Sequence, residues 1–346
     1  MKLATLRDGT RDGTLLVVSR SLKQAVKADH IAPTLQAALD DWGYCAPLLA
    51  ELAGELAERP SKRAFDLDVR ELMAPLPRAP QFADGSAYLV HAELIRRSRK
   101  GELPADAKRE PLMYQGCSAP LLGPCEDIVA VSESHGIDLE MELAVITDDV
   151  PMGVDRERAA EAIRLLVLVN DVSLRNLIAA ELAKGFGFFH SKPPSSFGPV
   201  AVTPDELGTA WDGKRAHGAV RAWVNGTLLG EPDAGVDMQF DFPRLIVHAA
   251  KTRPLPAGSI VGSGTVSNRD RSTGAGCLLE RRAEEILADG EAKTPFLGFG
   301  DRVRIEMAGP DGASIFGAID QQVVSAKART ASDAAAEPAA EAAQPS

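Results

Sequence analysis

Two glutamates, Glu140 and Glu142, lie in a segment, 138–147, in which apolar and polar residues alternate. This alternation is typical of a β-strand with one buried face. The two carboxylates then share the opposite face, where residues two apart are separated by about 6.5–7 Å. Such spacing lets both carboxylates reach one cation, although two acids on an edge strand are also an ordinary solvated surface.

Two further acids stand where a charge is difficult to accommodate. Asp171 follows the apolar run 165–170 and therefore ends a buried strand, where an unpaired charge is costly. Asp84 lies in the segment 82–86, shortly before a histidine. If these acids converge with the glutamate pair, they form a hard oxygen site suited to Mg²⁺, Ca²⁺ or Mn²⁺ rather than to zinc. Each acid alone could equally be a helix cap or a salt-bridge partner.

Cations and one histidine extend this set. Arg175 and Lys192 could hold a substrate carboxylate or a developing oxyanion, or could simply neutralise the acids. His91 is the candidate base, because a neutral imidazole can accept a proton from water near pH 7. Glu280 follows a glycine-rich run, 262–266, which lacks the lysine and the spacing of a phosphate loop. The remaining histidines to which we assign a structural role are His135, His190, His217 and His248.

Composition narrows the class of protein. The chain has 346 residues, 45% of them hydrophobic and 25% charged, and its net charge is −11. This acidic balance argues against nucleic acid or an anionic membrane as the main partner. The four cysteines show no paired metal spacing and indicate reduced thiols. Because no signal-type segment or membrane-spanning run is evident, we expect a cytoplasmic protein.

The first part of the chain predicts a small α+β unit. Apolar runs at 2–6 and 14–19 are joined by a segment with two Asp-Gly pairs, which favours a hairpin. The segment 33–59 has helical periodicity, with an expected interruption at 43–47.

Domain boundaries follow from composition. Prolines place a boundary near residues 74–80. We therefore expect a small N-terminal domain at 1–76, a catalytic domain at 77–325 and a disordered tail at 326–346. The tail is rich in Ala, Glu, Pro and Ser and cannot compensate the entropy lost on ordering.

The second region contains many short strand signals and few long helices. We expect a helix at 87–97 and another at 155–166, capped by Asp155, that continues into a strand at 166–170. A strand at 219–224 meets Asn225-Gly226, a strong hairpin signal. Further strands are expected at 259–261 and 303–305. This pattern favours an α+β, largely antiparallel architecture.

Five motifs in this order resemble the fumarylacetoacetate hydrolase family, with the short N-terminal domain of its bacterial members. They are Glu140-Met-Glu-Leu-Ala-Val, Asn170-Asp-Val-Ser-Leu-Arg175, Ser191-Lys-Pro with Gly198-Pro199 following, Gly262-Ser-Gly-Thr265 and Phe299-Gly-Asp-Arg-Val303. The resemblance covers roughly residues 80–325. It implies a catalytic domain of mixed β-sandwich and β-roll type, a homodimer, and a place in aromatic amino acid catabolism.

The resemblance also implies roles for individual residues. Family metal ligands match Glu140, Glu142 and Asp171, and the hydrolase branch adds an aspartate seven residues before its histidine, here Asp84. The cofactor is then Mg²⁺, or Ca²⁺ or Mn²⁺. The catalytic and substrate-binding positions match His91, Glu280, Arg175, Lys192 and Thr265.

In the reaction that this implies, His91 and Glu280 activate a water that attacks a carbonyl carbon of a 1,3-diketo acid. The carbon–carbon bond then breaks, and Arg175 and Lys192 steady the developing charge. The chain departs from the animal enzyme at Ser86, Ile178 and Leu182, which replace polar or aromatic substrate contacts. The resemblance therefore predicts the metal-binding and water-activating residues, but not the residues that recognise the part of the substrate remote from the metal.

Three functions remain open at this stage. The first is a metal-dependent hydrolase of C–C bonds in ketonic substances, acting on fumarylacetoacetate or an acylpyruvate. The second is a lyase or isomerase of a 2-oxo acid, namely a dehydratase, decarboxylase or tautomerase, in which no water acts as a nucleophile. The third is a non-catalytic metal-binding protein. In the first two the partner is a small diketo or 2-oxo acid, with no nucleic acid and no membrane.

Overall fold

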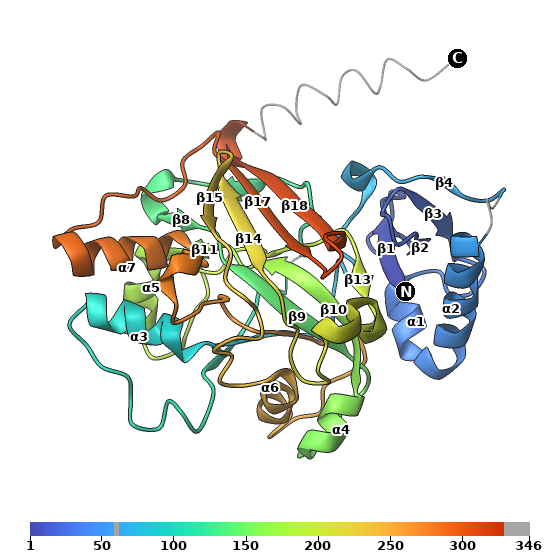
Figure 1. Ribbon diagram of the computed structural model, residues 1–346, viewed down its shortest axis with the longest axis horizontal. Helices are drawn as coiled ribbons and strands as arrows, with labels where there is room; N and C mark the ends of the chain where they lie inside the picture. The colour runs from blue at the N-terminus through green and yellow to red at the C-terminus, as the bar shows by residue number, and fades with distance from the viewer. Residues whose placement is uncertain (59–61, 119, 329–346) are drawn as a thin grey trace.

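The computed structural model describes residues 1–58, 62–118 and 120–328. The strands of a five-stranded sheet lie over the central strands of a larger, eleven-stranded sheet, and helices cover the sides (Figure 1). In spatial order, the larger sheet contains β4 (Phe65–Asp66), β3 (Gln24–Lys27), β2 (Thr14–Val18), β1 (Lys2–Leu6), β13 (Ala201–Val202), β10 (Ile163–Asn170), β9 (Met141–Thr147), β16 (Ile260–Gly262), β5 (Phe82–Gly85) and β6 (Met113–Gln115), with β12 (Ser196–Phe197) also paired to β10.

The remaining elements complete an α+β architecture. The smaller sheet contains β15 (Thr227–Gly230), β14 (Val220–Val224), β17 (Arg302–Ala308), β18 (Ser314–Ser325) and β7 (Ile128–Ala130), and β11 (Ser173–Leu174) pairs with β8 (Ile137–Asp138). The α-helices are α1 (Leu35–Asp40), α2 (Trp42–Glu58), α3 (Leu89–Ser98), α4 (Arg156–Glu161), α5 (Arg175–Leu182), α6 (Phe242–Ala249) and α7 (Leu278–Asp289). The 3₁₀ helices are η1 (Val69–Glu71), η2 (Glu133–His135), η3 (Pro204–Ala210) and η4 (Arg271–Thr273). Most strand pairs are antiparallel, so the predicted fold class is confirmed.

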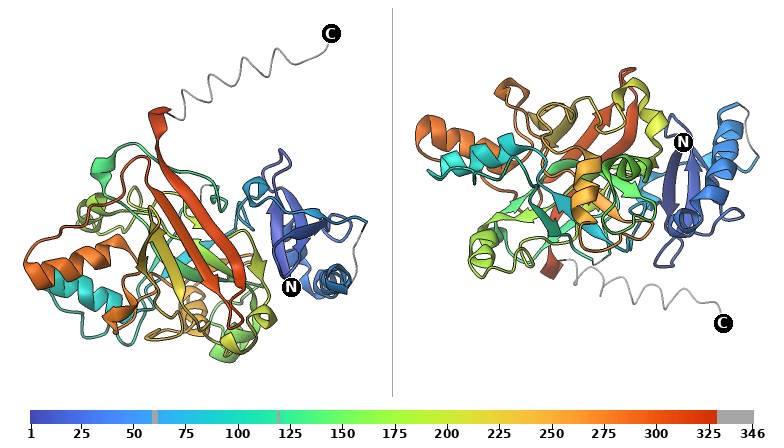
Figure 2. Two further views of the ribbon diagram at one scale, coloured as in Figure 1. Left: turned by 45° about the horizontal axis from the view of Figure 1, so that its top comes forward. Right: turned by 90° about the horizontal axis from the view of Figure 1, so that it is seen from below.

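The N-terminal elements lie to one side of the molecule in all three ribbon views (Figures 1 and 2). Strands β1 and β2 form the predicted hairpin, and β1 continues the larger sheet by pairing with β13. The strands of the first 76 residues thus extend the sheet that carries β9 and β10. The boundary between residues 76 and 77 stays a prediction, and most of the predicted tail, 326–346, lies outside the described residues.

The central strands β9 and β10 are buried on both faces, which corrects the expectation that segment 138–147 has one open face. Leu143 and Val145 pack into one hydrophobic cluster, whereas Ala144 and Ile146 pack into another. Glu142, on the side of the second cluster, is fully buried. The alternation arises because one face of β9 carries acids at its start, not because that face is solvated.

Two predicted helices differ in their bounds. The interruption expected at 43–47 is wrong: the break is at Asp41, and α2 continues through Pro47. Proline is tolerated there because the apolar face of α2 is buried against the sheet. The helix expected at 155–166 ends at Glu161, since the β-branched and leucine residues that follow belong to β10. Asp155 caps α4 as predicted.

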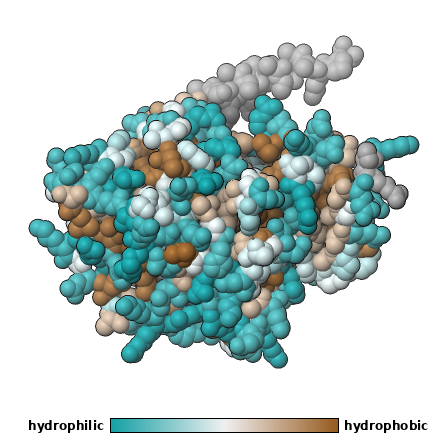
Figure 3. Space-filling view, in the orientation of Figure 1, coloured by the Kyte–Doolittle hydropathy of each residue, from teal (hydrophilic) through white to brown (hydrophobic). Residues whose placement is uncertain are grey.

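Other local predictions are confirmed. Asn225 and Gly226 have φ values of 50° and 79° and connect β14 to β15. This left-handed pair is the turn that matches the twist of a two-residue hairpin. On the face shown in Figure 3, apolar residues form separate patches within a mainly hydrophilic surface. Among the described residues, none of the helices has the length and apolar character needed to cross a bilayer.

Candidate active site

Three of the four predicted acids converge. Asp84 on β5, Glu142 on β9 and Asp171 just after β10 each offer one oxygen, and these oxygens lie within 4.8 Å of one another. Strand β16 lies between β9 and β5 and so sets the separation of the first two acids. We call this set the acidic triad. Its residues come from three segments of the chain, brought together by neighbouring strands and the end of β10.

Two glycines of the run 262–266 make room for the acidic triad. A Cβ at Gly262 would lie 2.2 Å from Asp84 Oδ1, so a larger residue would push the carboxylate away. Gly264 has a φ of 74°, and its N–H lies 3.1 Å from both Asp84 Oδ1 and Glu142 Oε2. This conformation suits glycine. The run therefore serves the carboxylates rather than a nucleotide phosphate.

The electrostatics of the acidic triad fit a bound divalent cation. Burial, followed by the charge of Asp171, raises the pKa of Asp84 to about 8. Burial and the two neighbouring aspartates also raise the pKa of Glu142 well above its usual range. Within the described residues Glu142 Oε1 has no hydrogen-bond partner. A hard cation would neutralise the like charges and give this oxygen a ligand.

Glu140, the fourth predicted ligand, has different neighbours. Its Oε1 accepts from Arg175 Nη2 at 2.7 Å and Thr265 Oγ1 at 2.6 Å. Its Oε2 accepts from Lys192 Nζ at 2.5 Å and Ser173 Oγ at 3.1 Å. Burial disfavours the Glu140 carboxylate, but Arg175 and Lys192 outweigh burial and hold its pKa well below its usual range. Its role as a metal ligand stays a prediction.

The two predicted cations are buried and remain protonated. Lys192 contacts Asp171 as well as Glu140. Burial lowers the pKa of Lys192, but these two carboxylates outweigh burial and raise it. The pKa of Arg175 is likewise raised by Glu140 despite burial. Lys192 thus brings positive charge to the acidic triad and Arg175 brings it to Glu140, and neither is a candidate base.

His91 and Glu280 form the predicted pair. His91 Nδ1 lies 2.9 Å from Glu280 Oε1, which also accepts from Ser267 Oγ at 2.6 Å. Glu280 Oε2 accepts from the N–H of Gly276 at 2.8 Å. Burial is the largest single effect on Glu280 and opposes its ionisation, but His91, Arg271 and Ser267 together outweigh burial and lower the pKa to about 2. The anionic Glu280 favours a proton on Nδ1, which leaves Nε2 of His91 to accept one.

The helices that carry this pair lie side by side, as Figures 1 and 2 show for α3 and α7. The N-terminus of α7 is held by Asp138, whose carboxylate accepts from the N–H groups of Leu278 and Leu279 at 2.8 and 3.0 Å. The same carboxylate accepts from Arg175 Nε at 2.8 Å. Asp138 therefore links the helix of Glu280 to the cation that contacts Glu140.

Sequence reasoning missed several side chains that contact the site, among them Asp138, Tyr114 and Ser195. Asp138 was detectable, because it shares the face of Glu140 and Glu142 in the alternation. Tyr114 on β6 donates its hydroxyl to Asp171 Oδ2, and Ser195 donates to Asp171 Oδ1 at 2.5 Å. No spacing in the sequence relates these two residues to Asp171, so only the pairing of β5 with β6 and the path of the chain after Lys192 reveal them.

The other histidines stand apart from these contacts. His190, His217 and His248 lie near Glu181, Asp212 and Glu110 respectively, and His135 ends η2. Of the residues that depart from the resembled pattern, Ile178 and Ser86 are half-buried and Leu182 is exposed.

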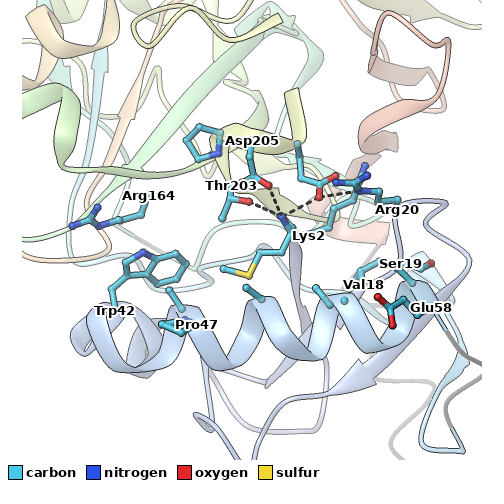
Figure 4. Close-up of a pocket in the computed structure, with 18 of the residues that line it drawn as sticks. Lys2, Val18, Ser19, Arg20, Trp42, Pro47, Glu58, Arg164, Thr203 and Asp205 are labelled. Atoms are coloured by element: carbon cyan, nitrogen blue, oxygen red, sulfur yellow. Dashed lines mark hydrogen bonds and ion pairs between the residues drawn. The ribbon is translucent and has the colours of Figure 1, made fainter. Parts of the chain in front are cut away.

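A separate cavity of about 740 Å³ lies between α2 and the segment that follows β13 (Figure 4). Small residues of α2 form its floor, with Trp42 at one end. Its cations are engaged: Arg20 lies 3.3 Å from Glu206, and Arg164 lies 2.7 Å from Asp148. None of the site residues described above lines this cavity. It is a seam between the N-terminal elements and the larger body.

Comparison with known families gives two matches. Residues 81–324 match the model described as fumarylacetoacetate (FAA) hydrolase C-terminal, and residues 1–78 match fumarylacetoacetase N-terminal domain 2. The two matches together span nearly the whole described chain.

Individual relatives include a hydrolase and a tautomerase. The chain is 30% identical over 159 residues to 2,4-didehydro-3-deoxy-L-rhamnonate hydrolase of Sphingomonas sp., covering 45% of this chain and 53% of the relative. It is 25% identical over 222 residues to the oxaloacetate tautomerase YisK of Bacillus subtilis, covering 63% and 69%. Its fold is similar to that of maleylpyruvate hydrolase from Sphingobium sp. in complex with manganese and pyruvate, with a TM-score of 0.61, 18% identity, and coverage of 94% and 99%.

Proposed function

The chain belongs to the fumarylacetoacetate hydrolase family, and from this premise we propose that it is a divalent-metal-dependent hydrolase of 1,3-diketo acids. The substrate is fumarylacetoacetate or an acylpyruvate. The observation that carries the proposal is the pairing of His91 with Glu280, 2.9 Å apart, in a site that also contains the acidic triad. A histidine held by a buried carboxylate is suited to take a proton from an attacking water.

The acidic triad would hold Mg²⁺, Mn²⁺ or Ca²⁺, with Glu140 as the fourth proposed ligand. When bound, the ion would polarise the oxygens of the diketo acid and lower the energy of the enolate that leaves. Asp171 is already oriented for this role by Ser195 and Tyr114. Carbonyl and carboxylate oxygens of a diketo acid are hard ligands that suit the same cation.

The chain's own residues would carry the proton transfers. Nε2 of His91 takes a proton from water, the hydroxide oxygen bonds to the carbonyl carbon distal to the pyruvoyl or acetoacetyl unit, and anionic Glu280 stabilises the resulting imidazolium. The bond between that carbon and the adjacent methylene carbon then breaks. Its electron pair forms the enolate, which takes the proton from the His91 imidazolium to give the ketone, while the attacked carbon leaves as a carboxylic acid that loses its own proton to solvent. Arg175, Lys192 and Thr265, which donate to Glu140, would donate to the substrate oxygens when substrate binds.

A second candidate is a lyase or isomerase of a 2-oxo acid. It is favoured by the similarity to an oxaloacetate tautomerase over most of that relative. In this reaction a base removes a proton next to a carbonyl and no carbon–carbon bond needs a hydroxide. The two candidates therefore differ in the source of the proton that His91 accepts. In hydrolysis it comes from the attacking water, and in enolisation it comes from the carbon next to the carbonyl.

The test is a substrate panel assayed with Mg²⁺, Mn²⁺ and a chelator. Fumarylacetoacetate and acylpyruvates report hydrolysis, whereas oxaloacetate reports tautomerisation and decarboxylation. The Glu280→Gln variant tests whether Glu280 helps His91 to activate the attacking water. We expect hydrolysis to fall by a factor of about 10²–10⁴ in Glu280→Gln. Hydrolysis that is undiminished in the variant would reject the role of Glu280, and activity that persists in EDTA would reject the metal. Metal binding without turnover of any of these acids would favour a non-catalytic protein.

We also propose that the chain acts as a homodimer with a domain boundary at residues 76 and 77. Light scattering on the full chain would test the first point. Limited proteolysis would test the second, with cleavage expected between the two units.

A further inference from the structure

A single carboxylate at the end of α5 gathers the segment that leads to Lys192. Glu181 is buried, and it accepts hydrogen bonds from the N–H groups of Phe189, His190 and Ser191 at 3.1, 2.6 and 3.1 Å. It also accepts from Ser191 Oγ at 2.5 Å. Three successive backbone donors thus point at one anion, immediately before the cation of the site.

The start of α5 holds the same segment from the other side. The N–H of Leu174 donates to the carbonyl of Ser191 at 2.8 Å, and Arg175 follows as the first residue of the helix. The helix therefore sets the distance between Arg175 and the segment of Lys192. Both cations reach the same carboxylate, at 2.7 Å from Glu140 Oε1 and 2.5 Å from Glu140 Oε2.

The loop between α5 and this segment supplies little support of its own. Gly185 and Gly187 have φ values of 78° and 91°, and Phe186 between them is 99% exposed. An anion in the last turn of a helix is also disfavoured by the helix dipole. The position of the Glu181 carboxylate is therefore explained by the hydrogen bonds that it receives from residues 189–191, not by the helix.

We propose that Glu181 is a positioning residue that holds Lys192 on Glu140 and Asp171. It acts by fixing the backbone of residues 189–191, so that the Lys192 side chain starts from a set point, and it does not touch the reacting atoms. This inference goes beyond the proposed function, although its kinetic test rests on that function.

The experiment is a double-mutant cycle between Glu181→Gln and Lys192→Met. An interaction made chiefly in the transition state changes kcat more than KM. We expect Glu181→Gln to lower kcat about tenfold with KM changed less than about twofold. In the Lys192→Met background the same substitution is expected to change kcat less than about twofold, because its target is already absent. Glu55→Gln, at an exposed residue of α2, is the matched control.

A second variant and a second readout separate the possible failures. Ser191→Ala removes one of the four hydrogen bonds without removing the charge, and is expected to lower kcat about threefold with the same dependence on Lys192. A second readout needs no turnover: the thermal shift caused by oxalate in the presence of Mn²⁺. We expect oxalate affinity to depend on the position of the Lys192 ammonium group. If the wild type binds oxalate but hydrolyses no diketo acid, the proposed function fails, and the cycle on oxalate affinity still decides this inference. An unchanged kcat, or an equal loss in the Lys192→Met background, would overturn it.

Discussion

Two sets of buried carboxylates lie side by side in this site, and they differ in what surrounds them. In the acidic triad, Asp84 and Glu142 face each other and Asp171, and burial with like charge raises the pKa of both. In the second set, Glu140 and Glu280 face cations or hydrogen-bond donors that outweigh burial and lower the pKa of both. Carboxylates of the acidic triad therefore face mainly other carboxylates, whereas Glu140 and Glu280 face groups that stabilise their negative charge.

The difference assigns roles that residue type alone does not. A buried anion that already has its counter-charge orients its neighbours, as Glu280 does for His91. The acidic triad has three carboxylates and one contacting cation, Lys192, so its excess negative charge is stable only when part of it is protonated or when a further cation binds. We therefore propose the acidic triad as the metal-binding half of the site, with Glu140 at its border as the fourth proposed ligand, and Glu280 as part of the scaffold half. The predictions below change one half at a time.

The largest effect is expected for Asp171→Ala. Asp171 belongs to the acidic triad and also contacts Lys192, so its removal takes away a proposed ligand and a partner of the cation. We expect turnover to fall at least about a thousandfold and the thermal shift on adding Mn²⁺ to disappear. Steady-state kinetics and melting curves with and without the ion measure both. Asp66→Ala, at an exposed residue of β4, should change neither, and a retained shift would place the ion elsewhere.

A pair of matched substitutions tests the comparison directly. In chelator at pH 7.5, Glu140→Gln should lower the free energy of unfolding by about 3 kcal/mol, because Arg175 and Lys192 lose their shared buried anion. Glu142→Gln should raise it by about 1 kcal/mol, since it removes like-charge repulsion. Urea unfolding of the two variants gives both values. Changes of the same sign would show that the two acids stand in equivalent surroundings.

The pH dependence of stability should have opposite slopes in two windows. Because the pKa of Asp84 is raised to about 8, the metal-free folded state binds more protons than the unfolded state from about pH 4 to 8, and stability falls as pH rises. The pKa of Glu280, lowered to about 2, gives stability that is lost as pH falls below about 4.5. A divalent ion at a hundred times its Kd should restore about 2.7 kcal/mol near pH 8. Asp84→Asn should reduce the slope in the upper window only, because Glu142, whose pKa is also raised by burial, still contributes to it, as followed by urea unfolding across pH.

Much of the acidic triad could be predicted from the sequence, because each acid is tied to a strand. Alternation placed Glu142, and the apolar run before Asp171 placed the end of β10. What the sequence could not supply is strand order. Asp84 approaches the other two only because β16 pairs with both β5 and β9. The pairing of β1 with β13 is equally hidden, since about 200 residues separate them.

The division between the two carboxylate sets was also beyond the sequence. Glu140 and Glu142 are equivalent in the alternation, yet one meets Arg175 and Lys192 and the other meets Asp84. These neighbours come from segments far apart in the chain, and their approach is fixed by tertiary packing. A carboxylate's charge state is therefore a property of the fold, whereas its position on a strand is a property of the sequence.

The smallest effect is expected for Tyr114→Phe, which touches only the metal-binding half. The Tyr114 hydroxyl donates to Asp171 Oδ2, and its ring packs edge-on against Phe188 with centroids 5.1 Å apart. Phenylalanine keeps the ring contact and removes only the hydroxyl, so the change is confined to the orientation of Asp171.

We expect the Kd for Mn²⁺, measured by calorimetry, to rise about five- to tenfold, near the low end of effects seen when a ligand loses a supporting hydrogen bond. Stability in chelator should fall by no more than about 1 kcal/mol, because Lys192 still contacts the same oxygen. Tyr44→Phe, at a side chain that is 64% exposed, is the control. If Mn²⁺ affinity is unchanged while stability falls, the hydroxyl supports the fold alone. Tyr114 would then act on stability alone, although it contacts Asp171, a proposed metal ligand.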